Sequence, residues 1–310
     1  MRLLFFTGKG GVGKSTISAA AAWQLSQHAR VLIVSLDPAH NLGDVFGVTL
    51  NHRKHRQAER LYLMEVDVAR HSRSYLEREI GMLSDTYGYN RAINLDSYFS
   101  VLKYSPGLEE YTLITSVEET LENEGGFDYI IFDTPPTGLT LRLLALPRIT
   151  LTWLERLIGL RRLILEKRHT IHNIQGPAAD NGGLRLVYDE HEDRVLTRLL
   201  GLKERYQKLS ARLEGPDSGV VLVFNPDPLS FRETERLIAG LNELHIPMRL
   251  LVDNKVEARN EAQAERIEAD LLALTGRLPV QRVRHSADLA SGGDVPLYQI
   301  PEDVVSQLWT

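Results

Sequence analysis

The sequence predicts an α/β protein with a doubly wound, mostly parallel sheet and an inserted helical lobe. Two observations support this prediction. Short apolar segments rich in Val, Ile and Leu, typical of strands buried on both faces, alternate with segments of helical periodicity. Two long stretches, residues 69–124 and 151–214, are poor in such strands and are charged and helical in pattern. We therefore expect an α/β domain of residues 1–68, 125–150 and 215–310, with the two other stretches forming the lobe.

Seven segments are the expected strands of the sheet. They are Arg2–Thr7, Val31–Leu36, Leu61–Val66, Tyr129–Phe132, Gly219–Phe224, Met248–Val252 and Leu278–Val283. Helical patterns lie between most of them, as in a sheet whose parallel strands are joined by crossover helices. The first strand should be central, because a ligand site in this kind of fold lies where the strand order reverses.

The turn after the first strand is rich in glycine. Gly8, four further residues, Gly13, Lys14 and Ser15 form a complete phosphate-binding loop, and a helix predicted from Ser15 to about Gln27 follows it. Backbone N–H groups of the turn and the positive end of the helix would hold phosphate oxygens. Lys14 would reach the β- and γ-phosphates, and Ser15 would bind Mg²⁺. The residues expected at the nucleotide are Gly8, Gly10, Gly11, Val12, Gly13, Lys14, Ser15 and Thr16.

Lys9 also lies in this loop, but the minimal phosphate site does not use it. Taken alone, it can be read either as a solvated surface lysine or as a functional group. The rest of the chain has to decide between the two interpretations.

Acidic residues follow two further predicted strands. Asp37 begins Asp37-Pro38-Ala39-His40-Asn41, at the strand end where a ligand is expected, and would orient the attacking water or take its proton. Asp133 follows four largely apolar residues and precedes Thr134-Pro135-Pro136-Thr137-Gly138. It would hold Mg²⁺, directly or through water. The structural alternatives are an Asp-Pro turn at Asp37 and a strand-end aspartate at Asp133.

Asn254 follows Val252 and Asp253 at the end of a late predicted strand. Its amide offers both a donor and an acceptor, which suits the edge of an adenine base. A turn asparagine is an equally good interpretation of this residue alone.

The composition is that of an ordinary globular protein, with 310 residues, 43% hydrophobic and 25% charged, and a net charge of -5. Mild acidity gives no reason to expect nucleic-acid binding. The chain contains no cysteine, which excludes disulfides, thiolate metal sites and Fe–S clusters. Met1 leads directly into the first strand, and no apolar run reaches the ~18 residues of a membrane span. We expect a cytoplasmic protein without a signal peptide or integral membrane segment.

The second helical stretch has heptad spacing. One seam is formed by Val195, Leu199, Leu202, Tyr206, Leu209 and Leu213. A similar stripe precedes it, formed by Leu151, Leu154, Ile158 and Leu165, with Arg161 at one of its positions. Thr170–Arg185 between them is expected to be a long loop. The stripe either packs within the lobe or offers a surface to a partner helix or a membrane.

Taken together, these motifs resemble the arsenical pump-driving ATPases and the related ATPases that target tail-anchored membrane proteins. The resemblance rests on four stretches in order along the chain: Gly8–Thr16, Asp37–Leu42, Asp133–Leu144 and Leu229–Leu237. The second and third are specific, because the wider superfamily usually keeps a bare aspartate at those places.

The resemblance implies an ATPase that works as a dimer with two ATP sites at the interface. By position, Lys9 would reach the nucleotide of the partner subunit, and Asp37 would position the attacking water. Asn41 would support the loop of Asp37, Asp133 would serve the Mg²⁺ shell, and Asn254 would contact adenine. Hydrolysis would then release the segments around Asp37 and Asp133 and turn the adjoining helices.

Two departures from the family pattern limit its function. Pumping members bind metalloid through cysteine, and many targeting members carry a paired-cysteine zinc site, so the cysteine-free chain is not expected to do either. The methionine-rich client groove of targeting members is also absent, since the predicted lobe holds Met82 alone. Because the chain has one phosphate loop, a homodimer is the natural way to assemble two sites.

The expected function is therefore a Mg²⁺-dependent homodimeric ATPase whose helical lobe binds a protein or hydrophobic-segment client. The alternative is an ATPase of the partitioning or septum-positioning kind, acting at a polymer or through peripheral contact with a membrane. The acidic, short end of the chain, Pro301–Thr310, argues against the septum type, which ends in a basic amphipathic helix. A third class, a small-molecule synthetase, has no substrate-binding constellation to support it. The sequence does not name a client.

Overall fold

The computed structural model of the protein describes residues 1–39, 41–68, 70–73, 107–175, 187–276, 278–285 and 296–309. The chain divides into two compact units. The sheet unit comprises Met1–Leu144 and Leu213–Thr310, and the hairpin unit comprises Ala145–Arg212. The expected division, with residues 69–124 in the lobe, stays a prediction; helix α5, Leu108–Asn123, groups with the sheet unit.

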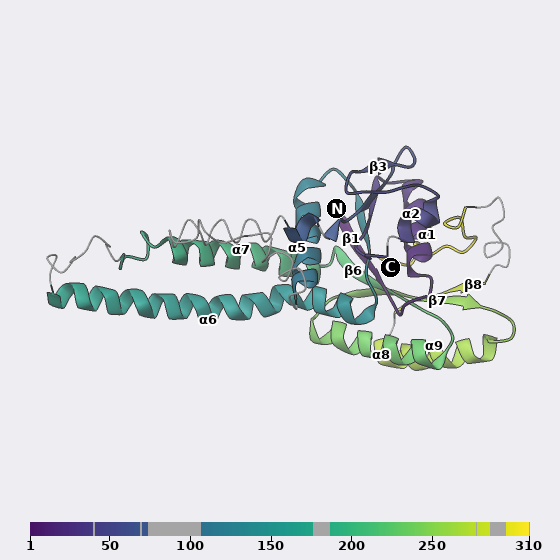
Figure 1. Ribbon diagram of the computed structural model, residues 1–310. Helices are drawn as coiled ribbons and strands as arrows, with labels where there is room; N and C mark the ends of the chain where they lie inside the picture. Colours follow the sequence, from purple (N-terminus) through teal and green to yellow (C-terminus); the bar gives the residue numbers. More distant parts are fainter. Residues whose placement is uncertain are drawn as a thin grey trace. The chain divides into compact units, whose positions relative to one another are not determined.

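The sheet unit contains an eight-stranded sheet of order β3-β4-β2-β5-β1-β6-β7-β8 (Figure 1). The strands are β1 Arg2–Thr7, β2 Val31–Ser35, β3 His55–Arg56, β4 Leu61–Glu65, β5 Tyr129–Asp133, β6 Ser218–Phe224, β7 Met248–Val256 and β8 Val280–Arg284. All neighbours pair in parallel except β3 and β4, which are antiparallel. The predicted fold class is confirmed, and β1 lies in the interior of the sheet between β5 and β6.

The differences from the expected strands lie at the edges. The short strand β3 was not predicted, because it has two exposed residues and therefore no apolar signal. Strand β7 runs four residues beyond the predicted end at Val252 and so includes Asn254.

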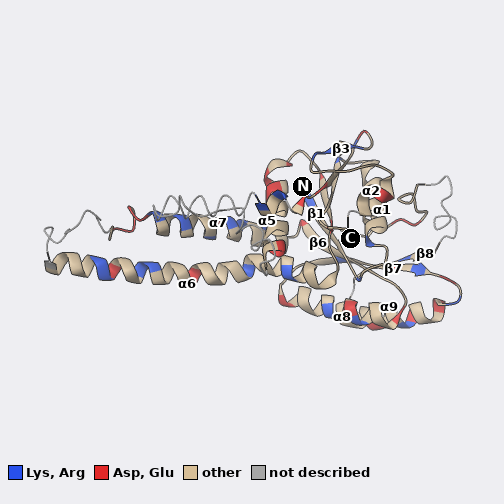
Figure 2. Cartoon of the chain, viewed as in Figure 1, with Lys and Arg blue, Asp and Glu red and all other residues tan. Residues whose placement is uncertain are grey.

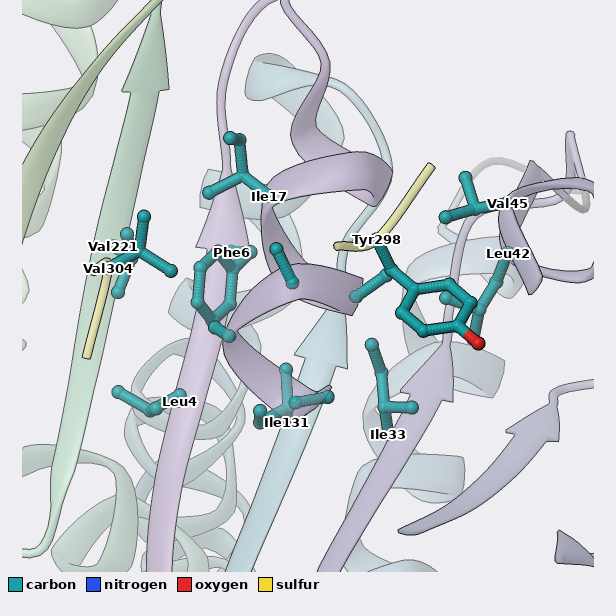
Figure 3. Close-up of a cluster of buried hydrophobic side chains, with 14 of the residues drawn as sticks. Leu4, Phe6, Ile17, Ile33, Leu42, Val45, Ile131, Val221, Tyr298 and Val304 are labelled. Carbon is teal, nitrogen blue, oxygen red and sulfur yellow. The ribbon is translucent and has the colours of Figure 1, made fainter. Parts of the chain in front are cut away.

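One face of the sheet is covered by α1, Lys14–Ser26, and α2, Asn41–Phe46. Figure 3 shows the core on this face, where side chains of β1, β2 and β5 meet α1 and the C-terminal segment. Gln24 on α1 fixes that segment at two points, donating to Glu302 O at 2.7 Å and accepting from Val304 N at 3.0 Å. The acidic end of the chain is therefore part of this packed face.

Alternate residues of each strand point to the other face of the sheet. There Phe5 stacks on Phe132 with ring centroids 4.9 Å apart. Helices α8, Pro228–Glu243, and α9, Glu261–Thr275, pack on β6 and β7. This arrangement leaves the loops that follow β1, β2 and β5 at one edge of the sheet, where the candidate site lies.

The hairpin unit is built from two long helices. Helix α6, Thr137–Gln175, begins in the sheet unit and continues into this one, and α7 is Arg194–Glu214. Ile158 and Leu165 of α6 pack with Leu196 of α7. The predicted stripe of α6 is therefore an inner seam between the helices, formed by Leu151, Leu154, Ile158, Arg161 and Leu165.

Two details of the predicted hairpin were wrong. The loop expected from Thr170 begins later, because α6 continues to Gln175; residues 176–186 lie outside the described residues. The seam of α7 begins at Leu196, which is 1% exposed, and not at Val195, which is 42% exposed. Asp193 caps the first turn of α7, because its carboxylate accepts a hydrogen bond from Leu196 N. This contact sets which residue of α7 faces α6.

None of the helices in the described part of the chain is long and apolar enough to cross a membrane.

Candidate nucleotide site

The glycine-rich turn between β1 and α1 has the geometry of a phosphate-binding loop. Gly13 caps α1 in a left-handed conformation, with φ of 91°, which disfavours residues with a side chain. A Cβ atom at this position would also lie 2.4 Å from Asn254 Nδ2. Gly8 is equally constrained, because a Cβ there would lie 2.1 Å from Val223 O. The two outer glycines of the motif are therefore required by the neighbouring strands β6 and β7.

Lys14, Asp37 and Asp133 meet at the carboxyl edge of the sheet. The ammonium of Lys14 donates to Asp37 Oδ2 at 3.1 Å and lies 3.5 Å from Asp133 Oδ1. The other oxygen of Asp37 accepts from Ala39 N at 3.1 Å, which shapes the loop after β2. All three side chains are buried. The structure thus brings together three residues predicted from separate motifs.

Asp133 is the electrostatically unusual member of this cluster. Burial raises the pKa of its carboxyl group, and the ammonium of Lys14 and the hydroxyl of Ser15 oppose that rise. Neither carboxylate oxygen accepts a hydrogen bond from the described residues. A fully buried carboxylate without hydrogen-bond donors is costly unless a ligand completes it. Its surroundings fit a hard cation, because the Asp133 oxygens and the Ser15 hydroxyl are the oxygen ligands that Mg²⁺ prefers.

Lys9 points to a different carboxylate. Its ammonium lies 3.8 Å from Asp227 Oδ1, and both side chains are partly exposed. Asp227 caps α8 by accepting from Leu229 N and Ser230 N. Sequence reasoning missed Asp227, although an aspartate before Pro228 is a typical helix start.

The remaining predicted residues lie around the loop. Asn254, on β7, is buried, and its Nδ2 donates to Val12 O at 2.7 Å. Asn41 is exposed at the first position of α2, and Thr16 lies half-buried in the first turn of α1. Lys255, which was not predicted as a site residue, donates from Nζ to Gly11 O at 2.7 Å. Sequence adjacency to Asn254 was the one signal that pointed to it.

Known proteins that are similar to this chain are ATPases, which agrees with a phosphate-binding loop. The family described as anion-transporting ATPases matches residues 1–273. The chain belongs to that family. It is 34% identical over 262 residues to the protein assigned as arsenical pump-driving ATPase 2 in Aquifex aeolicus, covering 84% of this chain and 82% of that one. It is 32% identical over 263 residues to ATPase GET3 of Paracoccidioides lutzii, covering 83% and 73%.

Other relatives are longer. The chain is 30% identical over 261 residues to the protein assigned as an arsenical pump-driving ATPase in Chlorobaculum tepidum, covering 83% of this chain but 61% of that relative. The family resemblance inferred from the motifs is confirmed, and the protein is an ATPase.

Proposed function

We propose that the protein is a Mg²⁺-dependent, cytoplasmic ATPase that acts as a homodimeric switch. The observation that carries this proposal is the cluster of Lys14, Asp37 and Asp133 beside the phosphate loop. Lys14 would move from the two carboxylates to the phosphates, which would leave Asp37 free to orient the attacking water. Ser15 and Asp133 would hold the Mg²⁺ ion, which when bound neutralises charge on the phosphates. Asn41 would support the loop of Asp37, and Asn254 would contact the adenine base.

Lys9 supports the dimeric form of the proposal. It shares the loop with Lys14, yet its ammonium lies at Asp227 and not at the pair of carboxylates that Lys14 contacts. A lysine at this place is available to a second subunit, where it would stabilise charge on the partner's nucleotide. Its own site would then depend on the partner's Lys9.

A mixing experiment tests this arrangement. Lys9→Ala and Asp37→Asn are each expected to bind ATP and hydrolyse it poorly. In an equal mixture, about half of the dimers are mixed, and each mixed dimer has one competent site, so about one quarter of wild-type activity should return. If Lys9 acts within its own subunit, no activity returns. The control mixture combines Asp37→Asn with Lys14→Ala. It should stay inactive, because each change disables the site of its own subunit and a mixed dimer then has no competent site.

The proposed client surface lies on α6. An outer seam is formed by Trp153, Leu157, Leu160, Ile164, Ile171 and Ile174, with Lys167 at the remaining heptad position. Each residue precedes a position of the inner-seam register by one, so the two seams lie about 100° apart on the helix. The apolar members of the outer seam are exposed; Trp153 is 61% and Ile174 78% exposed. A helix with two heptad seams is typical of one packed on two sides.

The charges along the outer seam indicate the chemistry of the client. Lys167 lies in the seam and Arg156 beside it, and Figure 2 shows basic residues recurring along α6 and α7. A second copy of the same seam would bring like charges together, so we propose an amphipathic helix with acidic flanks. Hydrolysis would act on it through α6, which begins at Thr137, soon after Asp133.

A labelled peptide tests the client surface. A heptad peptide with Leu at its seam and Glu at its flanks should bind Asp37→Asn in ATP more tightly than in ADP. A Leu160→Ser, Ile164→Ser variant should lose that binding, and Arg162→Ser, on the polar side of α6, should retain it. Binding of a Lys-flanked peptide equally well would contradict the charge argument. Co-sedimentation with anionic liposomes in ATP without peptide binding would favour the membrane-surface alternative.

A further inference from the structure

Strand β7 changes its backbone geometry at Lys255. The pairing with β8 runs regularly to Asn254 opposite Val283 and resumes with Val256 opposite Arg284, so Lys255 is an extra, bulged residue. Its φ angle is 60°, in the left-handed region that a lysine rarely adopts. Bulges and left-handed side-chain residues are costly and occur often beside functional sites, where they redirect a side chain.

The chain after β7 holds this conformation in place. Asn260 Nδ2 donates to Lys255 O at 3.2 Å, and its Oδ1 accepts from Glu257 N at 2.8 Å. The side-chain amide of Asn260 therefore holds the backbone at both Lys255 and Glu257. The bulge directs the Lys255 side chain to the phosphate loop, where Nζ donates to Gly11 O at 2.7 Å.

Two amides act on the next carbonyl of the loop. Asn254 Nδ2 donates to Val12 O at 2.7 Å. The amide of Asn225 also faces this oxygen, and in its flipped orientation, which satisfies both of its polar atoms, the nitrogen would donate to Val12 O at 3.2 Å. Side chains at the carboxyl ends of β6 and β7 thus hold two successive carbonyls of the loop, those of Gly11 and Val12.

Holding a carbonyl also orients an N–H group. In a planar peptide the C=O and the following N–H point in opposite directions. The contacts to Gly11 O and Val12 O therefore turn the N–H groups of Val12 and Gly13 away from β7. Val12 N donates to Lys9 O at 3.4 Å, so this weak backbone bond and the Lys255 contact together shape the turn at Gly10 and Gly11. Lys255 matters most for the outer turn, because a Cβ atom at Gly10 or Gly11 would meet no described atom within 4 Å. Packing alone does not fix that turn.

We propose that Lys255 is a positioning residue of the nucleotide site. Its ammonium holds the Gly11 peptide so that the phosphate loop is ordered before nucleotide arrives, and it steadies the segment that carries Lys9. This inference rests on the proposed nucleotide site. If the bulge served the sheet alone, glycine or asparagine would adopt its left-handed conformation at lower cost.

The test compares Lys255→Asn with Lys255→Arg. Asparagine tolerates the left-handed backbone but cannot reach Gly11, whereas arginine keeps a charged donor. We expect Lys255→Asn to weaken the binding of a fluorescent ATP analogue about five- to tenfold while kcat changes less than about twofold. Amide exchange of residues 11–13 in nucleotide-free protein should accelerate. Lys255→Arg should restore affinity to within about twofold of the wild type.

Two controls separate the outcomes. His245→Asn replaces the other described non-glycine residue with positive φ, 58°, on the α8–β7 connection, and should leave affinity unchanged. Lys14→Ala should abolish binding. If Lys14→Ala still binds the analogue, the proposed nucleotide site is wrong. If Lys14→Ala fails to bind while Lys255→Asn matches the wild type in affinity and exchange, the site stands and the role of Lys255 is overturned.

Discussion

Each unit of the molecule pairs a basic side chain with at least one buried carboxylate, but the two clusters differ. In the sheet unit, Lys14 is shared between Asp37 and Asp133, and the oxygens of Asp133 accept no hydrogen bond from the described residues. In the hairpin unit, Arg161 binds both oxygens of Asp193, at 3.0 and 2.5 Å, and Asp193 also accepts from Leu196 N.

The electrostatic consequences are opposite. Burial raises the pKa of Asp133, whereas the guanidinium of Arg161 holds the pKa of Asp193 below its usual value. A buried carboxylate whose oxygens accept no hydrogen bond can take a ligand, whereas one whose hydrogen bonds are complete stabilises the fold. We therefore interpret the first cluster as a site and the second as a structural link between α6 and α7.

The largest expected effect comes from changing Asp37. Asp37→Asn keeps the size of the side chain but removes the charge that would orient the attacking water. We expect kcat to fall about 10²- to 10³-fold while ATP affinity changes little. Steady-state hydrolysis together with equilibrium binding measures both quantities. Asp44→Asn, on the exposed side of α2, is the matched control and should hydrolyse ATP normally. Normal turnover by Asp37→Asn would contradict the interpretation of the Lys14 cluster as a catalytic site.

The structural side is tested at Arg161. Arg161→Met keeps the length of the side chain but leaves Asp193 buried without its cation, so it should destabilise the hairpin unit by about 3 kcal/mol. Urea denaturation and amide exchange of α7 measure this loss, and ATP binding should not change. Arg162→Met is the control, because its contact with Glu190 at 3.3 Å is exposed and should cost less than about 0.5 kcal/mol. Equal losses in the two variants would contradict the structural role.

These clusters also show what could be predicted from the sequence. The fold class, the loop and the meeting of Asp37 with Asp133 follow from local patterns, because the carboxyl ends of neighbouring parallel strands share an edge. The inner seam was predicted with Arg161 in it, but its partner Asp193 lies 32 residues away across the turn and has no signal in the heptads. Lys255 was missed as a site residue because its contact with Gly11 depends on a bulge and a positive φ angle.

A further buried carboxylate, Asp253, tests whether missing hydrogen bonds alone mark a site. It lies in β7, fully buried, and neither oxygen has a hydrogen-bond partner among the described residues. Burial, followed by the nearby carboxylate of Glu268, raises its pKa to about 8, against the opposing charge of Arg282. Arg282 itself binds Glu268 through two nitrogens, at 2.6 and 2.7 Å. Asp253 should therefore be protonated in the folded protein at neutral pH.

The folded state then retains a proton that the unfolded chain loses above about pH 4. The contribution to stability is complete below the unfolded pKa and is lost as pH rises toward about 8. Asp253→Asn removes this dependence, so its stability relative to the wild type should rise between pH 5 and pH 8 by about 3 to 4 kcal/mol. Urea denaturation at both pH values measures the difference, and Asp270→Asn, exposed on α9, should show none. Unchanged ATP hydrolysis in Asp253→Asn would show that a neutral acid can occupy a core without a ligand. A loss of hydrolysis would instead extend the site through Asn254 to this side of β7.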